Sequence, residues 1–284
     1  YWKTHALQLL LPKMSPSMKI SCKHSFYFIT ACLFCVFGIV HAFSLPKSRV
    51  FDQEVYNALP KLSNDQWAQL EKLGDLLTEW NEKVNLISRK DIDNVMVRHI
   101  LPCLAMAASI DIDPGWTVMD VGTGGGLPGL PLAICNPQTQ FLLVDARGKK
   151  IEAVADMAER LGLAHVKALH TRVEDINEPC DLILGRSVTA LPRFMMWTRK
   201  NLVHPGPPGS TKMRGIAYIK GGNFEDELGG IDLKPEKAIA LNTVFSSLAD
   251  SDKNVLLFKA QDILEVRPAM FKRAIKKASP AATM

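Results

Sequence analysis

The chain has 284 residues, of which 47% are hydrophobic and 22% are charged, so it can bury a full core and is not a disordered polymer. Its net charge of +5 is uneven: residues 1–42 carry lysines and no acid, residues 266–284 carry five basic residues and no acid, and the stretch between is slightly acidic. The basic end suits a phosphate backbone, and a solvated, frayed terminus explains it equally well.

Residues 1–50 have the pattern of a targeting leader. An apolar run at 25–42 follows Lys19 and Lys23, and its core of about fifteen residues is short for a membrane span. The run ends in a small residue, Ala42, and Phe43 follows. This resembles the signal-plus-transit leader of algae with secondary plastids. We therefore expect plastid import and no stable membrane partner after leader removal, with secretion or a cytoplasmic location as alternatives.

The cysteines give no sign of a metal centre. Cys32 and Cys35 form a CxxC inside the apolar leader, without a second pair or a histidine cluster. Three of the others are scattered, as expected of buried thiols in a reducing compartment. We predict no metal site.

Residues 51–112 are predicted to form a helical segment. Apolar residues recur there at three- and four-residue spacing, namely Trp67, Leu70, Leu73, Leu77 and Trp80. Ser63 and Gln66 resemble a capping box at its start. A second helical piece runs from about Asp91 to Pro102, and residues 113–115 form a turn.

From residue 113 to 265 strands and helices alternate, which predicts an α/β domain with a mainly parallel sheet. Strands are expected at 117–121, 140–145, 165–169, 181–186, 216–220, 237–246 and 254–260, the last two as a hairpin. Helices are expected at 128–134, 148–161 and 190–202. Residues 204–215 form a loop, and 266–284 form a basic tail.

A glycine-rich turn follows the first predicted strand, and this strand–turn–helix unit is typical of a nucleotide pocket. Gly124, Gly126 and Gly129 satisfy GxGxxG, and Asp145 ends the next strand, where a carboxylate can hold a ribose diol. Asp120, directly before the turn, suits a cofactor ammonium and would repel a pyrophosphate. These features favour S-adenosylmethionine over a dinucleotide.

Each acidic residue also has a structural interpretation. Asp120 could cap the loop backbone, and Asp145 could cap the helix that begins near Arg147. Glu174, in the acidic turn after the third strand, could meet the adenine edge or simply face solvent.

Residues 65–260 resemble the RsmG (GidB) family of 16S ribosomal RNA guanine-N7 methyltransferases. The resemblance lies in WNEKVNLIS at 80–88, VRHIL at 97–101, the glycine loop at 120–129 and RVE at 172–174. It implies a Rossmann-like class I S-adenosylmethionine-dependent methyltransferase. Together with the loop itself, it predicts these cofactor contacts: Gly122, Gly124, Leu127, Asp145, Val173, Glu174 and Arg186.

The sequence departs from the family pattern at two places. Gly125 stands where the family commonly has proline, which should loosen the turn, and Pro102-Cys103 replaces the usual Asp-Ser after HIL. The motifs expected to bind the cofactor are thus intact, and the departures concern the part of the site expected to bind the substrate.

Guanine N7 carries a free lone pair, so its methylation needs positioning and no general base. We accordingly predict no catalytic residue. Arg98, His99, Lys220 and the basic tail are candidates for RNA contact, although Arg98 and His99 could also be structural.

The expected partner is small-subunit ribosomal RNA or a pre-ribosomal subunit, bound by a monomer. Alternatives are a methyltransferase of the same fold acting on another RNA or a small molecule, an NAD(P)-dependent oxidoreductase, and a non-catalytic ribosome-assembly factor.

Overall fold

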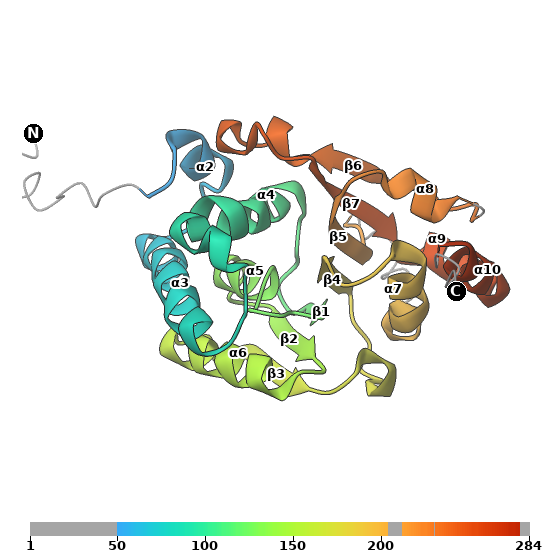
Figure 1. Ribbon diagram of the computed structural model, residues 1–284, viewed down its shortest axis with the longest axis horizontal. Coiled ribbons are helices and arrows are strands. Elements are labelled where there is room, and N and C mark those ends of the chain that lie inside the picture. The colour runs from blue at the N-terminus through green and yellow to red at the C-terminus, as the bar shows by residue number, and fades with distance from the viewer. Residues whose placement is uncertain (1–49, 204–211, 230, 279–284) are drawn as a thin grey trace, which may run out of the picture. The chain divides into compact units, whose positions relative to one another are not determined.

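The computed structural model describes residues 50–203, 212–229 and 231–278. The predicted leader and its Cys32–Cys35 pair therefore lie outside the described residues, apart from Val50. From Phe51 onward the described residues belong to one compact unit (Figure 1). None of its helices, over the part that the structure describes, is both long and apolar enough to cross a membrane.

The core of the unit is a seven-stranded sheet with the order β3-β2-β1-β4-β5-β7-β6. Strands β1 to β5 are parallel, whereas β7 pairs antiparallel with both β5 and β6. The strands are β1 Thr117–Val121, β2 Gln140–Asp145, β3 Val166–His170, β4 Leu182–Arg186, β5 Gly215–Gly221, β6 Lys237–Ala240 and β7 Lys253–Lys259. The predicted α/β fold with a mainly parallel, Rossmann-like sheet and a closing hairpin is confirmed.

Helices cover both faces of the sheet because side chains of successive strand residues point to opposite faces. Val118 of β1 lies in one core, with residues of α3, α4, α5 and α6, and Met119 lies in the other, with residues of α7, α8, α9 and α10. The helices after β1 are α5 Gly129–Cys135, α6 Gly148–Arg160, α7 Leu191–Thr198, α8 Phe224–Leu228, α9 Ala260–Glu265 and α10 Pro268–Ala278.

The strand predicted at 237–246 is too long. Strand β6 ends at Ala240, and 3-10 turns follow at Leu241–Thr243 and Ser246–Leu248. Leu241, Phe245 and Leu248 are buried. Their spacing is helical, so a helical course turns all three side chains toward the core.

The segment before β1 is helical, as predicted. It consists of α2 Gln53–Ala58, α3 Asn64–Lys83, a 3-10 helix Arg89–Asn94, a π-helix Met96–Ile100 and α4 Leu101–Ser109. The capping box of Ser63 and Gln66 is present at the start of α3. The second piece does not stop at Pro102, because proline is tolerated in the first turn of a helix and stands there in α4.

Two residues of the WNEKVNLIS element connect α3 to the rest of the unit. Trp80 Nε1 donates to Asp156 Oδ2 of α6 at 2.7 Å. Asn81 is buried, and its Oδ1 accepts from the amides of Leu86 and Ile87 at 2.8 and 2.9 Å. This element thus has a structural role: Asn81 shapes the turn that leaves α3.

Replacing Asn81 by alanine should destabilise the fold, because two buried amides lose their acceptor. We expect Asn81→Ala to lower the free energy of unfolding by roughly 2–4 kcal/mol, given about 1–3 kcal/mol for an unsatisfied buried group. Urea unfolding measures this. Glu82→Ala, a change at the neighbouring exposed position, is the control and should shift the value by less than about 0.5 kcal/mol. Equal stability of the two variants would contradict this role of Asn81.

The basic segment after residue 265 is not a free tail over its described part. It forms helix α10, in which Phe271 and Ala274 are buried in the same core as α7. Phe271 and Ala274 are three residues apart and so lie on one helix face. This face anchors the segment to the domain.

Candidate functional site

The glycine loop lies at the carboxyl edge of the sheet, between β1 and α5. The amides of Gly122 and Thr123 donate to the carbonyl of Val144 at 2.8 and 3.0 Å. Gly122 has a φ of +68°, and a Cβ there would lie 2.9 Å from both γ-carbons of Val188. Glycine is therefore required at this position, both for the backbone conformation and for the close approach of the loop after β4.

Asp120 holds this loop from beneath. Its Oδ2 accepts from Thr123 Oγ1 at 2.6 Å and from the amide of Gly129 at 2.9 Å, and the side chain is fully buried. Burial raises the pKa of this carboxyl to about 6. The loop-capping interpretation of Asp120 is thus confirmed. The Gly129 amide, the first of α5, thus already donates to a carboxylate. A pyrophosphate would lose this donor and would lie close to Asp120, so the start of α5 is a poor pyrophosphate site.

Asp145 stands at the end of β2 and binds the other side of the loop. Its Oδ2 accepts from the amide of Gly124 at 3.0 Å, and its Oδ1 accepts from the amide of Arg147 at 2.9 Å. Arg147 is itself the N-cap of α6, so Asp145 braces the turn before the helix and does not cap it. Each carboxylate oxygen keeps a further lone pair, which suits hydroxyl donors such as a ribose diol.

The backbone of the loop is open at Gly124. A Cβ on Gly124 would meet no atom closer than 3.9 Å, so the backbone is open there to a ligand. Leu127 and Val173 are buried, and Glu174 is exposed on the 3-10 turn Val173–Asp175 beyond β3. An open loop backbone beside a carboxylate suits a nucleoside with a ribose diol.

Arg186, at the end of β4, binds the π-helix Met96–Ile100. Its Nη1 donates to the carbonyl of His99 at 2.9 Å, and its Nη2 approaches the carbonyl of Arg98 at 3.3 Å and His99 Nδ1 at 3.0 Å. Cys103 Sγ lies 3.5 Å from Nη1. The structure therefore brings together three predicted site residues and gives Arg186 a positioning role; its contact with the cofactor stays a prediction.

His99 is held neutral in this arrangement. Burial and the Arg186 guanidinium lower the pKa of the imidazole to about 4. Because Arg186 donates to Nδ1, the neutral ring carries its proton on Nε2, which lies 3.5 Å from Asp91 Oδ2. The side chain is only 12% exposed, whereas that of Arg98 is 63% exposed. The structural interpretation therefore suits His99, and Arg98 remains accessible to RNA.

Asp120 and His99 should act on stability in opposite directions as the pH changes. The folded pKa of Asp120 lies above its unfolded value, so its contribution is lost as the pH rises from about 4 to 6. The folded pKa of His99 lies below its unfolded value, so its contribution is lost as the pH falls from about 6.5 to 4.

Asp120→Asn keeps one acceptor oxygen and removes the titration. Relative to the parent, its free energy of unfolding should rise by roughly 2–3 kcal/mol between pH 4 and pH 7, at 1.36 kcal/mol per pKa unit. For His99→Gln the corresponding difference should have the opposite sign. Denaturant unfolding at the two pH values tests both, and parallel curves for parent and variants would contradict the assigned pKa shifts.

Lys220 lies at the end of β5, beside a cavity of about 310 Å³ lined by Ser187, Val188, Thr189, Ile219, Lys220 and Gly221. Its Nζ pairs with Glu227 Oε1 at 2.5 Å, and its side chain is 18% exposed. The cavity adjoins the glycine loop, because Val188 lines the cavity and lies close to Gly122. An RNA contact by Lys220 would compete with the ion pair to Glu227.

The backbone that forms this cavity contains residues that the sequence analysis missed. Ser187 has a φ of +54°, a strained value for a residue with a side chain. The buried Tyr218 hydroxyl accepts from the amides of Val188 and Thr189 and donates to the carbonyl of Thr189. In the sequence, Tyr218 looks like an ordinary strand residue. Residues 187–189, however, directly follow a predicted strand at the point where the strand order reverses, and this position could have identified them as site residues.

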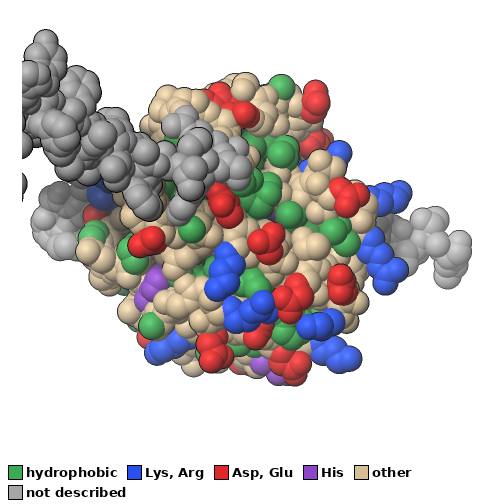
Figure 2. All heavy atoms as spheres, turned by 90° about the vertical axis from the view of Figure 1, so that its left-hand side faces the viewer, with side chains coloured by type: hydrophobic (Ala, Val, Ile, Leu, Met, Phe, Trp, Pro, Cys, Tyr) green, Lys and Arg blue, Asp and Glu red, His purple; other side chains and the backbone are tan. Residues whose placement is uncertain are grey.

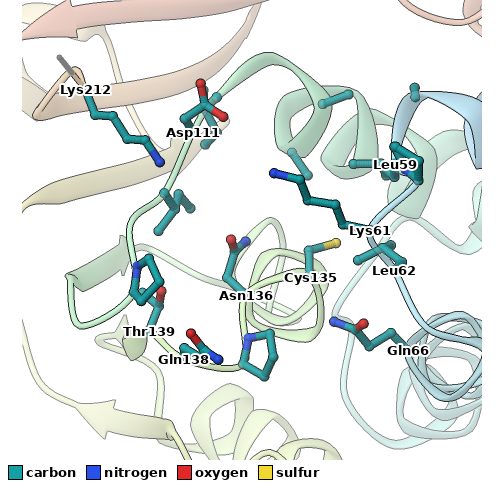
Figure 3. Close-up of a pocket in the computed structure, with 18 residues that line it drawn as sticks. Leu59, Lys61, Leu62, Gln66, Asp111, Cys135, Asn136, Gln138, Thr139 and Lys212 are labelled. Carbon is teal, nitrogen blue, oxygen red and sulfur yellow. The ribbon is translucent and has the colours of Figure 1, made fainter.

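A larger cavity of about 540 Å³ opens at the opposite edge of the sheet (Figure 3). Lys61 and Lys212 approach it from different sides, near Asp111 and Asn136. Pro114 and Thr139, which precede β1 and β2, also line it. It therefore lies at the amino ends of the strands, away from the glycine loop, and does not form part of the site. In the described residues no cluster of metal ligands occurs.

The sequence model of the GidB family, described as rRNA small subunit methyltransferase G, matches residues 66–254. The chain belongs to the GidB family. Curated proteins named Ribosomal RNA small subunit methyltransferase G are similar to it. That of Christiangramia forsetii is 42% identical over 66% of this chain and 86% of the relative. That of Porphyromonas gingivalis is 43% identical over 60% and 76%, and that of Flavobacterium johnsoniae is 43% identical over 62% and 83%.

The departures from the GidB pattern lie close to the site. Gly125 packs tightly, since a Cβ there would lie 3.1 Å from Leu86 and 3.3 Å from Leu77. Cys103 is buried, its thiol donates to the carbonyl of His99 at 3.1 Å, and burial raises its pKa to about 11. Cys103 thus stays a neutral thiol that packs against Arg186.

Proposed function

We propose that this protein transfers a methyl group from S-adenosylmethionine to N7 of a guanine in small-subunit ribosomal RNA. The observation that carries the proposal is the GidB match over residues 66–254, which spans the glycine loop, Asp145, Glu174 and Arg186. The names of the relatives give the RNA, and the chemistry of the site supports the choice of N7.

When bound, S-adenosylmethionine supplies an electrophilic methyl group for in-line displacement. Asp145 would accept hydrogen bonds from its ribose, and Val173 and Glu174 would border its base. Gly122 and Gly124 let the loop pass close to it.

On the acceptor side, the cavity lining contains one titratable side chain, Lys220, and Glu227 pairs with it. No base faces the cavity from these residues. A guanine N7 needs none, because its lone pair lies in the ring plane and no proton leaves before attack. Catalysis then consists of orienting the base and excluding water.

Equilibrium binding separates this proposal from its alternatives. We expect purified protein to bind S-adenosylmethionine in calorimetry and not NAD or NADP. Binding of a dinucleotide alone would favour an oxidoreductase, and binding of neither would favour an assembly factor without a working pocket.

Asp145→Ala should weaken cofactor binding by roughly 1–3 kcal/mol, the scale of a lost charge-assisted hydrogen bond. Asp145→Asn, which keeps one acceptor oxygen, should lose less. The dissociation constant for S-adenosylmethionine is the measurement, with the thermal midpoint recorded in parallel. A lower midpoint with unchanged affinity would restrict Asp145 to bracing the loop.

We also propose that residues 1–50 direct the protein to a plastid. The support is the apolar run at 25–42 followed by Phe43 and a basic, hydroxyl-bearing stretch. The full chain carrying a C-terminal fluorescent protein should enter the plastid of an alga with secondary plastids. Fluorescence in the secretory pathway or the cytosol would contradict this.

A further inference from the structure

Helix α10 follows the part of the chain that the GidB family matches, which ends at residue 254. It is firmly attached to α7. Phe271 and Ala274 are buried, and the Arg199 guanidinium lies 5.6 Å from the centre of the Phe271 ring. Arg199 also donates to the carbonyls of Leu264 and Val266, at 3.0 Å each, directly before α10 begins.

The opposite side of α10 carries charge of one sign. The α10 basic face consists of four exposed side chains: Lys272, Arg273, Lys276 and Lys277. Residues 266–278 include no acid, and no described carboxylate lies within ion-pairing distance of these four. Like charges spaced i and i+4 disfavour a helix, so this face is not arranged for the stability of α10 itself.

Other helical surfaces of the molecule differ from this face. Acidic and basic residues alternate on the exposed side of α3, for example Asp75, Glu82 and Lys83. Figure 2 shows the two signs interspersed over the side of the molecule that carries α2 and α3. Lys276 and Lys277 lie in the last helical turn, where basic side chains interact favourably with the helix dipole. Lys272 and Arg273 lie earlier in α10 and do not gain this interaction.

Helix α10 packs against helices that begin at the carboxyl edge of the sheet. Helix α7 begins next to residues 187–190 at the carboxyl edge of the sheet, and Arg199, just past its far end, binds the start of α10. Helix α10 then packs along α7 and also contacts α8, which follows β5 at the carboxyl edge (Figure 1). Helix α10 therefore lies on the same face of the sheet as α7 and α8.

We propose that the α10 basic face binds the phosphodiester backbone of the RNA substrate and so extends the RNA surface beyond the GidB-matched region. This inference rests on the proposed function for the identity of the RNA. A polyanion fits the face because its charges are exposed, of one sign and fixed in place by α7. Insertion into a membrane does not fit, because the apolar side of α10 is buried against the domain.

The test compares two charge-matched variants of the full chain. In the first, the four residues of the α10 basic face are changed to glutamine. In the control, four exposed lysines elsewhere are changed to glutamine: Lys61, Lys167, Lys234 and Lys237. The probe is transcribed bacterial 16S ribosomal RNA, and its affinity is measured from 50 to 200 mM salt. Thermal midpoints show whether each variant is folded. If the fourfold α10 variant unfolds, the double variant Lys276→Gln/Lys277→Gln replaces it.

We expect the α10 variant to lose about tenfold or more in RNA affinity at low salt, and its slope of log affinity against log salt to fall by roughly 2–3. The KM for RNA should rise while kcat and S-adenosylmethionine affinity stay unchanged. Equal slopes for the α10 variant and the control would overturn the proposal. The proposal would also be overturned if the α10 variant kept its RNA affinity and lost only its binding to anionic phosphatidylserine vesicles, measured in parallel.

These results are distinguishable from failure of the proposed function. If the parent protein binds RNA with the α10-dependent slope and leaves no N7-methylguanosine, the proposed function is wrong and the RNA surface stands. If the parent methylates RNA and the α10 variant does so with an unchanged KM, the RNA surface is wrong and the proposed function stands.

Discussion

Arg186→Ala is expected to be both destabilising and nearly inactive. Removal of the guanidinium takes one donor away from the carbonyls of Arg98 and His99 and from His99 Nδ1; the His99 carbonyl keeps the Cys103 thiol. We expect the free energy of unfolding to fall by roughly 3–5 kcal/mol, since hydrogen bonds to a charged group contribute about 1.5–3 kcal/mol each and do not add fully. Methyl transfer should fall by about 100-fold or more, because the π-helix loses its tether to the end of β4.

The control for this prediction is Arg160→Ala. Arg160 also binds acidic side chains, Glu79 and Asp156, but it does so on the surface, where solvent screens the ion pairs and they contribute little to stability. Arg186→Lys keeps the charge and should recover only part of the loss, because an ammonium cannot reproduce the forked contacts. Urea unfolding and a methylation assay are the measurements. An Arg186→Ala protein as stable and active as Arg160→Ala would show that this tether is unimportant.

Gly122→Ala should have the second largest effect. An alanine at position 122 would have to adopt a left-handed backbone conformation, which costs about 1–2 kcal/mol. Its Cβ would also lie 2.9 Å from the γ-carbons of Val188. Val188 cannot move freely, because its side chain is β-branched and its amide is held by the Tyr218 hydroxyl at 2.9 Å. We expect the dissociation constant for S-adenosylmethionine to rise by roughly 10- to 100-fold, or about 1.4–2.8 kcal/mol.

Two further variants separate strain from collision. Gly115→Ala places a side chain at a φ of +82° with no atom within 4 Å, far from the loop, and should leave cofactor affinity unchanged. Val188→Ala introduced together with Gly122→Ala should restore part of the affinity by removing the clashing methyls. If the double variant binds no better than Gly122→Ala, close packing between the two loops is not the cause of the loss.

The sheet was predictable because its strands are short, apolar and regularly punctuated. The ends predicted for β1 and β2 agree with the structure: β1 ends at Val121, one residue after Asp120, and β2 ends at Asp145. Strand β6 was overextended, because the residues that follow it bury apolar side chains in helical turns that look like more strand. Helix α4 was not predicted to continue beyond Pro102. A proline in the first turn of a helix and a proline that follows the end of a helix look the same in the sequence.

The candidate site was predictable to a different degree. The glycines after β1 are local features, so their spacing in the sequence placed them correctly on the loop. The partners of Arg186 are not local: Arg98 and His99 lie more than eighty residues earlier, and only the fold brings them to the end of β4. For the same reason the sequence suggested that residues 266–284 were a tail, although Phe271 and Arg199 fix α10 to the domain.

The most direct test of the central claim is to locate the methyl group. Purified protein is incubated with S-adenosylmethionine and unmodified small-subunit ribosomal RNA, and the RNA is then reduced with borohydride and cleaved with aniline, which breaks the chain at N7-methylguanosine. We expect cleavage at one guanine that depends on both enzyme and cofactor. Methylation at a different atom, or no methylation by protein that binds the cofactor and the RNA, would contradict the account.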